Sequence, residues 1–369
     1  MKPKLICILH CSPPNHGASK VGDFIFSCEA LRENFNSRFI KINSSSTISQ
    51  IDKIQFKKFT STFILYVKIL SSLLIHRPDK VYFTASNKSY AFYRDFLIGF
   101  FFKIYNFFKA VDIYYHYHTK GVDDFVSESR LKKWLTNFFI KNVNIILLSP
   151  MLKEDFNKVQ SYKKILFLPN GVDSILSESE FTDMIQKKYV KSDHINILFL
   201  SNMIKAKGYF KLLELANETK NKHIHYHFAG GWQKIEDEEE FYNYISTNKL
   251  EDKVTFHGFV NNDKKKELFK KSHIFIFPTR YKNEAFPLSI LEALSSGLPV
   301  ISSDEGSIPY IIDSESGIVL RDLDKLHDAL LLALKSLVSK KSALYCRNLY
   351  LSKYSLDRFE DNLISILSQ

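Results

Sequence analysis

Residues 273–303 read HIFIFPTRYKNEAFPLSILEALSSGLPVISS, and this stretch decides the fold. A short apolar strand pattern is followed by a polar loop, a helix and a second strand pattern. Pro287 suits the first residue of the helix, because its missing N–H costs nothing there. Gly297 caps the other end of the helix, and Pro299 follows it. A strand, a helix and a strand in this order predict one unit of a parallel α/β sheet.

Similar strand patterns alternate with longer helical patterns along the whole chain. We expect strands at 5–10, 38–42, 80–84, 112–118, 144–149, 165–169, 195–201, 223–230, 253–258, 273–278, 298–303 and 317–320. Two successive series of this kind predict an α/β protein with two doubly wound, Rossmann-like domains. Apolar periodicity fades between residues 177 and 194. We therefore expect the first domain at 1–185, the second at 186–352 and a terminal helix at 353–369.

The composition indicates a globular protein and excludes several classes. The chain has 369 residues, of which 45% are hydrophobic and 25% are charged. The apolar run at 97–102 is far shorter than the roughly 20 residues that span a bilayer, and the run at 5–9 is too short for a signal-peptide core. The four cysteines show no disulfide or zinc spacing, which suits a reducing compartment.

The net positive charge of the chain comes entirely from its first half. Residues 1–190 contain 27 basic and 16 acidic residues, whereas residues 191–369 contain 24 of each. This asymmetry indicates an acidic partner for the first half, such as an anionic membrane surface. A lysine-rich surface that only contacts solvent explains the same numbers, and both interpretations stay open.

Two carboxylates interrupt the apolar stretch, at Glu284 and Glu292. Glu284 lies in the loop after a strand, where ligands bind in open α/β sheets. The backbone at Ala285, Phe286, Pro287 and Leu288 forms a helix N-terminus, where free N–H groups suit an anionic or hydroxylated ligand. Glu292 lies in the second turn of the helix, and a buried, unpaired carboxylate would cost several kcal/mol. It therefore needs a partner that the neighbouring sequence does not supply.

The spacing E-x7-E, followed by EALSSGLPVI, resembles the signature of retaining GT-B glycosyltransferases, the large glycosyltransferase family four that includes bacterial lipopolysaccharide and capsule enzymes. The resemblance implies that Glu284 contacts hydroxyls of the donor sugar and that Glu292 accepts hydrogen bonds from the ribose. Without nucleotide, Glu292 is then expected to be unsatisfied or bridged by water. The resemblance also implies that the terminal helix crosses back to the first domain.

A lysine-bearing loop follows the strand at 195–201. Lys207 is placed to neutralise a diphosphate as a point charge. The loop resembles the family motif Gly-Arg-x4-Lys-Gly but departs from it, because Ser201 and Asn202 replace Gly-Arg. We expect Lys207 to bind the diphosphate with help from Ser201 and Asn202. Gly230, at a strand end in FAGGW, allows close approach of the backbone to the nucleotide.

The first half supplies the acceptor side in this resemblance. The loop after the first strand, with His16, Gly17, Ala18 and Ser19, resembles the flexible acceptor loop of the family. Strand alternation puts His116 and His118 on one face. His118, followed by Thr119, Lys120 and Gly121, resembles the family's histidine at this strand end, which implies a catalytic contact near the donor sugar together with Lys207 and Glu284. His116 is favoured as a core residue.

The segment 89–110 is rich in Phe and Tyr, with more aromatic surface than one core-facing stripe needs. Insertion at a membrane interface explains the surplus, and so does burial between the sheet and neighbouring helices.

The chain is therefore expected to be a retaining, metal-independent hexosyltransferase of cell-surface polysaccharide synthesis. The partners are a nucleotide sugar (UDP- or GDP-linked) and a glycan acceptor carried on a lipid, with no cofactor, no metal and no nucleic acid. Asp322 and Asp324 are expected to cap a helix, not to bind a metal. The expected location is the cytoplasm, with peripheral association at the inner membrane face. A sugar-nucleotide 2-epimerase on the same fold, and a non-catalytic glycan- or membrane-binding protein, remain the alternatives.

Overall fold

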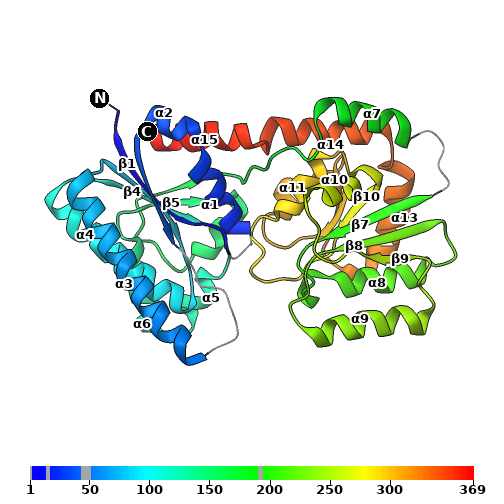
Figure 1. Ribbon diagram of the computed structural model, residues 1–369, viewed down its shortest axis with the longest axis horizontal. Helices are drawn as coiled ribbons and strands as arrows, with labels where there is room; N and C mark the ends of the chain where they lie inside the picture. The colour runs from blue at the N-terminus through cyan, green and yellow to red at the C-terminus, as the bar shows by residue number, and fades with distance from the viewer. Residues whose placement is uncertain (1, 14–16, 43–50, 190–193) are drawn as a thin grey trace. The chain divides into compact units, whose positions relative to one another are not determined.

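The computed structural model describes residues 2–13, 17–42, 51–189 and 194–369, with the backbone alone over 51–59. The chain forms two compact units. The first contains residues 1–170 and 359–369, and the second contains residues 171–358. Each unit is a parallel sheet covered by helices (Figure 1). The α/β architecture with two doubly wound domains is confirmed.

The first unit has a six-stranded sheet in the order β2-β1-β3-β4-β5-β6. Its strands are β1 (Lys4–His10), β2 (Asn36–Ile42), β3 (Lys80–Ala85), β4 (Asp112–Tyr117), β5 (Asn144–Leu147) and β6 (Lys164–Phe167). Its helices are α1 (Gly17–Ser27), α2 (Glu29–Asn34), α3 (Ile51–His76), α4 (Ser89–Phe108), α5 (Val122–Ser127), α6 (Arg130–Ile140) and the 3-10 helix η1 (Pro150–Phe156). Strand order reverses between β1 and β3, because β2 lies on one side of β1 and all later strands lie on the other.

The second unit has a six-stranded sheet in the order β12-β11-β10-β7-β8-β9. Its strands are β7 (Ile195–Leu200), β8 (Ile224–Ala229), β9 (Val254–Phe256), β10 (Ile274–Phe277), β11 (Val300–Ser303) and β12 (Gly317–Leu320). Its helices are α7 (Glu178–Lys188), α8 (Tyr209–Glu218), α9 (Ile235–Asn248), α10 (Asn262–Lys271), α11 (Leu288–Ser295), α12 (Ile308–Ile311), α13 (Leu326–Ser336) and α14 (Lys340–Lys353), with 3-10 helices η2 (Lys205–Lys207) and η3 (Leu323–Lys325). Strand order reverses between β7 and β10.

The central strands form the core of both units. The side chains of Ile6, Cys7 and Ile8 in β1 are fully buried, and so are those of Phe275 and Ile276 in β10. Strands buried on both faces read as continuous apolar runs, which is why the central strands could be located from sequence. The helix after β10 begins at Leu288, one residue later than expected, with Pro287 in extended conformation just before it.

The boundary between the units lies at Asn170/Gly171, and the expected boundary at 185/186 is wrong. It would cut through α7, which packs into the second unit. Leu176, Phe181, Met184 and Ile185 form one buried cluster with Ala343 of α14. Polar residues obscured this helix in the sequence, because only its narrow inner face is apolar.

The last helix, α15 (Leu356–Ser368), begins in the second unit, and its residues from Phe359 onward group with the first. Phe359, Leu363, Ile366 and Leu367 form its buried stripe. The terminal residue Gln369 accepts a hydrogen bond from Lys164 of β6 at 3.1 Å.

Candidate functional site

The predicted donor residues gather at the switch point of the second sheet. β7 and β10 are hydrogen-bonded neighbours, and the chain leaves them toward opposite halves of the sheet. Ligands of doubly wound proteins bind outside the carboxyl ends of two such strands. The loop with Lys207 follows β7, and the loop with Glu284 follows β10. The topology therefore brings together two loops that are far apart in sequence.

Lys207 and Glu284 form an ion pair in this place. The Lys207 Nζ lies 3.4 Å from the Glu284 Oε2, and both side chains are largely buried. The contact is a charge pair without the alignment of a hydrogen bond, since Oε2 has no hydrogen-bond partner among the described residues. The rings of Phe277 and Tyr281 lie 5.8 and 5.5 Å from the Lys207 ammonium. Glu284 Oε2 thus retains acceptor capacity in a mostly apolar setting.

The neighbouring lysine of the same loop has different partners. Lys205 forms ion pairs with Glu240 and, at 3.7 Å, with Asp237, both on α9. These contacts direct Lys205 toward α9, whereas Lys207 is directed toward Glu284. The two lysines of the sequence KAK therefore have separate roles.

Glu292 is paired with a lysine of the protein itself, so the expectation of an unsatisfied or water-bridged carboxylate is wrong. The residue is 7% exposed, and its Oε1 accepts a hydrogen bond of 2.5 Å from the Nζ of Lys265 in α10. A buried carboxylate is stabilised strongly by such a cation. Sequence reasoning missed Lys265, because it belongs to a lysine run in a surface helix and its spacing to Glu292 follows no motif.

Glycine backbone lets the loops of the site approach one another closely. Gly230 has φ +148°, and a Cβ there would lie 1.8 Å from the carbonyl oxygen of Ser201. Gly306 has φ +57°, and a Cβ there would lie 2.2 Å from the carbonyl oxygen of Glu284. Met203 N–H donates to the Gly231 carbonyl at 2.8 Å. The loops after β7, β8, β10 and β11 therefore support one another.

The predicted residues around this core are placed as follows. Ser201 is half-buried, and Asn202 is exposed at the carboxyl end of β7. The side chains of Ala285, Phe286, Pro287 and Leu288 are buried. The ring of Phe286 packs edge-on against Tyr354, with centroids 6.0 Å apart. These four residues can therefore offer a ligand backbone atoms and the N-terminus of α11, but not side chains.

In the first unit, His116 and His118 share a face as predicted, with ring centroids 4.0 Å apart. His116 is fully buried, and its Nδ1 is 2.5 Å from the Tyr82 hydroxyl. Burial lowers the pKa of His116 well below its usual value, which keeps the ring neutral and confirms its assignment to the core. His118 follows the end of β4 and is half-buried. Its role near a donor sugar stays a prediction.

The predicted acceptor loop is only partly described. His16 lies outside the described residues. Gly17, Ala18 and Ser19 form the first turn of α1, so their assignment to a loop is wrong. Ser19 is fully buried, 3.4 Å from the Ser12 hydroxyl. Ser12 N–H donates to the Asp23 carboxylate at 3.2 Å, which ties the end of β1 to the helix.

Asp322 lies at the start of a 3-10 helix. Asp322 caps η3 by accepting a hydrogen bond of 3.0 Å from the Asp324 N–H, which confirms the capping role. Within the described ranges, no group of three or more His, Cys, Asp or Glu side chains could hold a metal ion.

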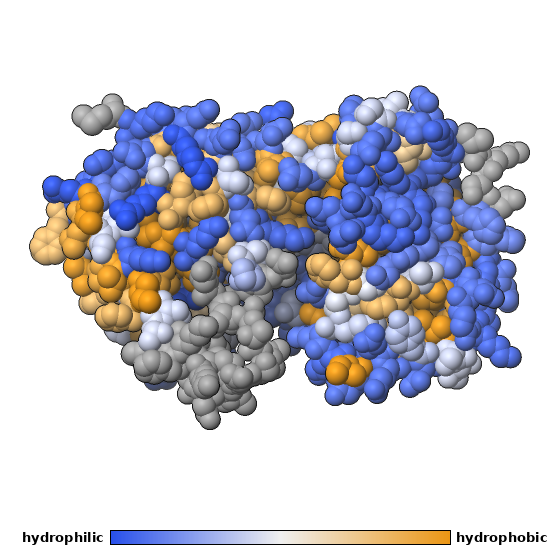
Figure 2. All heavy atoms as spheres, in the orientation of Figure 1, coloured by the Kyte–Doolittle hydropathy of each residue, from blue (hydrophilic) through white to orange (hydrophobic). Residues whose placement is uncertain are grey.

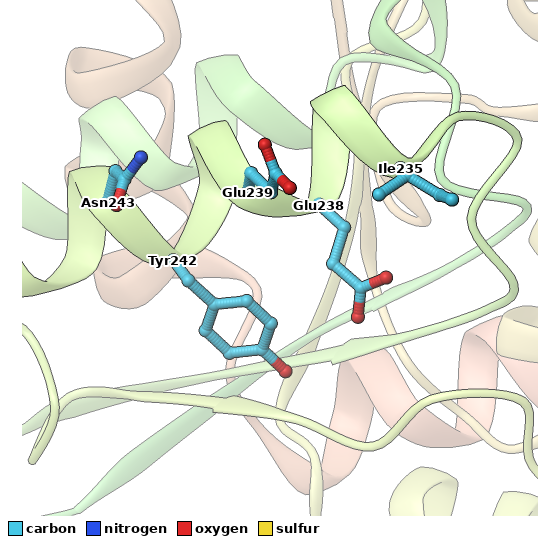
Figure 3. A pocket seen from close by; sticks show the side chains of 5 residues that line it. All are labelled: Ile235, Glu238, Glu239, Tyr242 and Asn243. Carbon is cyan, nitrogen blue, oxygen red and sulfur yellow. The ribbon is translucent and has the colours of Figure 1, made fainter.

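A shallow hollow of about 440 Å³ lies over α9, lined by Ile235, Glu238, Glu239, Tyr242 and Asn243 (Figure 3). The five residues that line this hollow all belong to α9, and none of them is a predicted donor residue.

The part of the chain that matches a known protein family lies within the second unit. Residues 180–347 match the family model described as "Glycosyl transferases group 1". An uncharacterized glycosyltransferase of Methanocaldococcus jannaschii is 29% identical over 47% of this chain and 46% of that protein. The alpha-galactosylglucosyldiacylglycerol synthase of Streptococcus pneumoniae is 25% identical over 47% of each chain. The matches thus span about half the length of these relatives.

Solved structures match the whole chain in fold. HepE of Anabaena, in complex with UDP and glucose, gives a TM-score of 0.68 at 16% identity over 100% of both chains. The lipopolysaccharide outer core galactosyltransferase WaaB gives 0.70 at 15% identity over 99% of this chain and 100% of that one. These likenesses establish the GT-B fold. Among the described helices, none combines the length and the apolar character needed to cross a membrane.

Proposed function

Residues 180–347 form a glycosyl transferases group 1 domain, and from this premise we propose that the chain transfers a hexose from a nucleotide diphosphate to a glycan acceptor. The observation that carries the proposal is the buried pair of Lys207 and Glu284 at the switch point of the second sheet. An ammonium group suits a diphosphate, and a carboxylate accepts hydrogen bonds from sugar hydroxyls. The pair therefore suits the two neighbouring parts of one donor.

The remaining donor contacts follow from the same arrangement. Glu292 would accept hydrogen bonds from the ribose hydroxyls while Lys265 balances its charge. Ser201, Asn202 and the backbone at Gly230 would supplement Lys207 at the phosphates. The N-terminus of α11 adds a positive dipole end near the anionic donor.

The proposed mechanism is retaining and metal-independent. As the bond between sugar and diphosphate breaks, negative charge grows on the phosphate oxygen, and Lys207 stabilises it. The acceptor hydroxyl attacks the anomeric carbon from the face that the diphosphate leaves, and its proton passes to the departing phosphate. Catalysis comes from positioning and electrostatic stabilisation, with no enzyme nucleophile. We assign His118 a contact with the donor sugar as part of this proposal.

The names of similar proteins support the classes of donor and acceptor. HepE was crystallised with UDP-glucose, which favours a UDP-sugar. A diacylglycerol glycolipid synthase and a phosphatidylinositol N-acetylglucosaminyltransferase subunit are among the relatives, which favours an acceptor carried on a lipid. WaaB is a lipopolysaccharide enzyme, which favours cell-surface polysaccharide synthesis. We place this activity at the inner face of the cytoplasmic membrane.

A thermal-shift screen against UDP- and GDP-sugars tests the donor assignment, since a ligand that binds only the folded state raises the melting temperature. We expect a rise with UDP-sugars that the Lys207→Met variant lacks. Failure of every nucleotide sugar to stabilise the protein would refute the proposal.

Product analysis then tests the reaction. Transfer to a glycolipid acceptor with retained anomeric configuration, undiminished by EDTA, is expected. Isomerised nucleotide sugar formed without acceptor would identify a 2-epimerase instead. Binding of nucleotide sugar with neither product would indicate a non-catalytic protein.

A further inference from the structure

Three neighbouring helices of the first unit expose an unusual amount of apolar surface. Of the 24 large hydrophobic side chains that are exposed in the described residues, 15 lie on α3, α4 and α6. They are Phe63, Ile64, Val67, Leu70, Leu74 and Ile75 on α3, Tyr90, Tyr93, Leu97, Phe100, Ile104, Phe107 and Phe108 on α4, and Leu131 and Trp134 on α6. Single exposed apolar residues are normal, but a concentration of this kind marks an interaction surface.

These side chains form one surface because the helices adjoin. α4 contacts α3 on one side and α6 on the other, and Figure 1 shows the three together at one side of the first unit. In Figure 2, hydrophobic residues cover the region of α3 and α4. We call this surface the three-helix face.

The inner side of α4 is already filled, so the exposed aromatics are surplus to the core. Phe92, Ile98 and Phe102 are buried against the unit. On the outer side, Phe107 is 86% exposed and Phe108 is 79% exposed. Their rings touch edge-on, with centroids 5.4 Å apart. The segment 89–110 is therefore both a core helix and an exposed one.

The charges on the three-helix face are almost all positive. Among the described side chains of α3, α4 and α6, the cations are Lys68, Arg94, Lys103, Arg130, Lys132 and Lys133. The single carboxylate among them is Asp95, which is fully buried and paired with Arg94 at 2.7 Å. Lys68, Arg130 and Lys133 are exposed. An occupant of this face meets apolar groups and cations, and no exposed carboxylate among the described side chains of these helices.

This chemistry fits one occupant better than the others. An anionic lipid surface accepts aromatic and aliphatic side chains at its interface and attracts lysines and arginines with its headgroups. A second copy docked on the same face about a two-fold axis would bring two faces of the same positive charge together, with no exposed carboxylate among their described side chains to offset the repulsion. We propose that the three-helix face docks on an anionic membrane, with Phe107, Phe108 and Trp134 entering the headgroup region.

The inference rests on the membrane location proposed above and names the surface responsible for it, but its residues belong to the first unit alone. Lys207 and Glu284, which carry the transfer proposal, belong to the second unit. An experiment can therefore show loss of membrane docking while donor binding is kept. It can also show loss of donor binding while membrane docking is kept.

Flotation of the full-length protein with vesicles tests the docking. We expect binding to vesicles of phosphatidylcholine mixed with phosphatidylglycerol, and much weaker binding to phosphatidylcholine alone. Phe107→Ser with Phe108→Ser should lower the partition coefficient by about tenfold for each phenylalanine that enters the interface. Arg130→Gln with Lys133→Gln should lower it by about fivefold for each cation.

A matched pair of variants distinguishes docking through this face from nonspecific adsorption of exposed apolar side chains to vesicles. Leu74 on α3 and Ile235 on α9 of the second unit are both 72% exposed. Leu74→Ser should weaken vesicle binding, whereas Ile235→Ser should not. All variants should keep the melting temperature of the wild-type protein to within a few degrees, which shows that they fold independently of any donor binding.

Three results would overturn the proposal. One is a wild-type protein that does not float with anionic vesicles. Another is equal loss of binding in Leu74→Ser and Ile235→Ser. The third is a concentration-dependent dimer that Phe107→Ser and Phe108→Ser dissociate while vesicle binding stays unchanged, because the face would then serve a second copy.

Discussion

At the scale of single residues, the two glutamates of the E-x7-E stretch differ in what surrounds them. Glu284 faces Lys207 across 3.4 Å and keeps an oxygen without a hydrogen bond, whereas Glu292 is held by Lys265 at 2.5 Å. The first carboxylate is prepared to accept new hydrogen bonds. The second is already neutralised, so a ligand must share it with Lys265.

Lys207→Met should lower kcat/KM for transfer by about 10²–10³-fold, the usual loss when a group that stabilises transition-state charge is removed. The neighbouring Lys205 supplies the control, because its ammonium is paired with Asp237 and Glu240 of α9. Steady-state kinetics should therefore show near-normal turnover for Lys205→Met. An equal loss in both variants would contradict the assignment of Lys207.

Lys265→Met should destabilise the unliganded protein by about 3–5 kcal/mol, because it leaves the buried Glu292 carboxylate unpaired. The double variant Lys265→Met with Glu292→Gln should recover most of this loss, since an amide tolerates burial without a cation. Urea denaturation of the single and double variants measures both values. If the double variant is no more stable than Lys265→Met, the ion pair is not the cause.

At the scale of elements, a row of histidines links β8, β9 and the start of β7. His227 Nε2 lies 3.3 Å from Asn196 Oδ1, so this nitrogen carries the proton and donates. Its Nδ1 is then an acceptor, 3.3 Å from Nε2 of His257. Burial, with added repulsion from Lys271, lowers the pKa of His227 from 6.5 to about 3. The folded sheet therefore needs a neutral His227.

This arrangement predicts acid sensitivity with a definite sign. Below about pH 6.5 the unfolded chain binds a proton at His227 that the folded chain does not bind, so stability falls as the pH is lowered toward 3. The melting temperature of the wild type should drop more between pH 7 and pH 5 than that of His227→Gln. An equal drop in the wild type and in His227→Gln would contradict this assignment.

At the scale of the whole molecule, one buried arginine fixes where the second unit begins. Arg347 of α14 is almost fully buried. It donates to the carbonyls of Ser295 and Leu176, at 2.5 and 3.1 Å, and to Ser174 Oγ at 2.5 Å. These bonds fasten the segment after residue 170 to α11. These contacts attach the polar segment after residue 170 to the second unit, which is why the boundary between the two units lies at Asn170/Gly171.

Arg347→Met should therefore cost about 2–4 kcal/mol in unfolding free energy, because it leaves buried carbonyls unsatisfied. It should also expose the chain near residues 171–178 to limited proteolysis, which mass spectrometry of the fragments detects. Arg358→Met, at the other end of the same unit, provides a comparison. Equal cleavage in the wild type and in Arg347→Met would show that other contacts hold this segment.

The sequence by itself determined the strands, the two-domain α/β class and the positions of Lys207 and Glu284 in loops after β7 and β10. It could do so because buried parallel strands are continuous apolar runs, and ligand-binding loops follow their carboxyl ends. Only the tertiary structure decided that Lys265 partners Glu292, that Arg347 assigns α7 to the second unit, and that α3, α4 and α6 form one apolar, cationic face. Each of these depends on contacts between side chains far apart in sequence, and the chain carries no local pattern that encodes them.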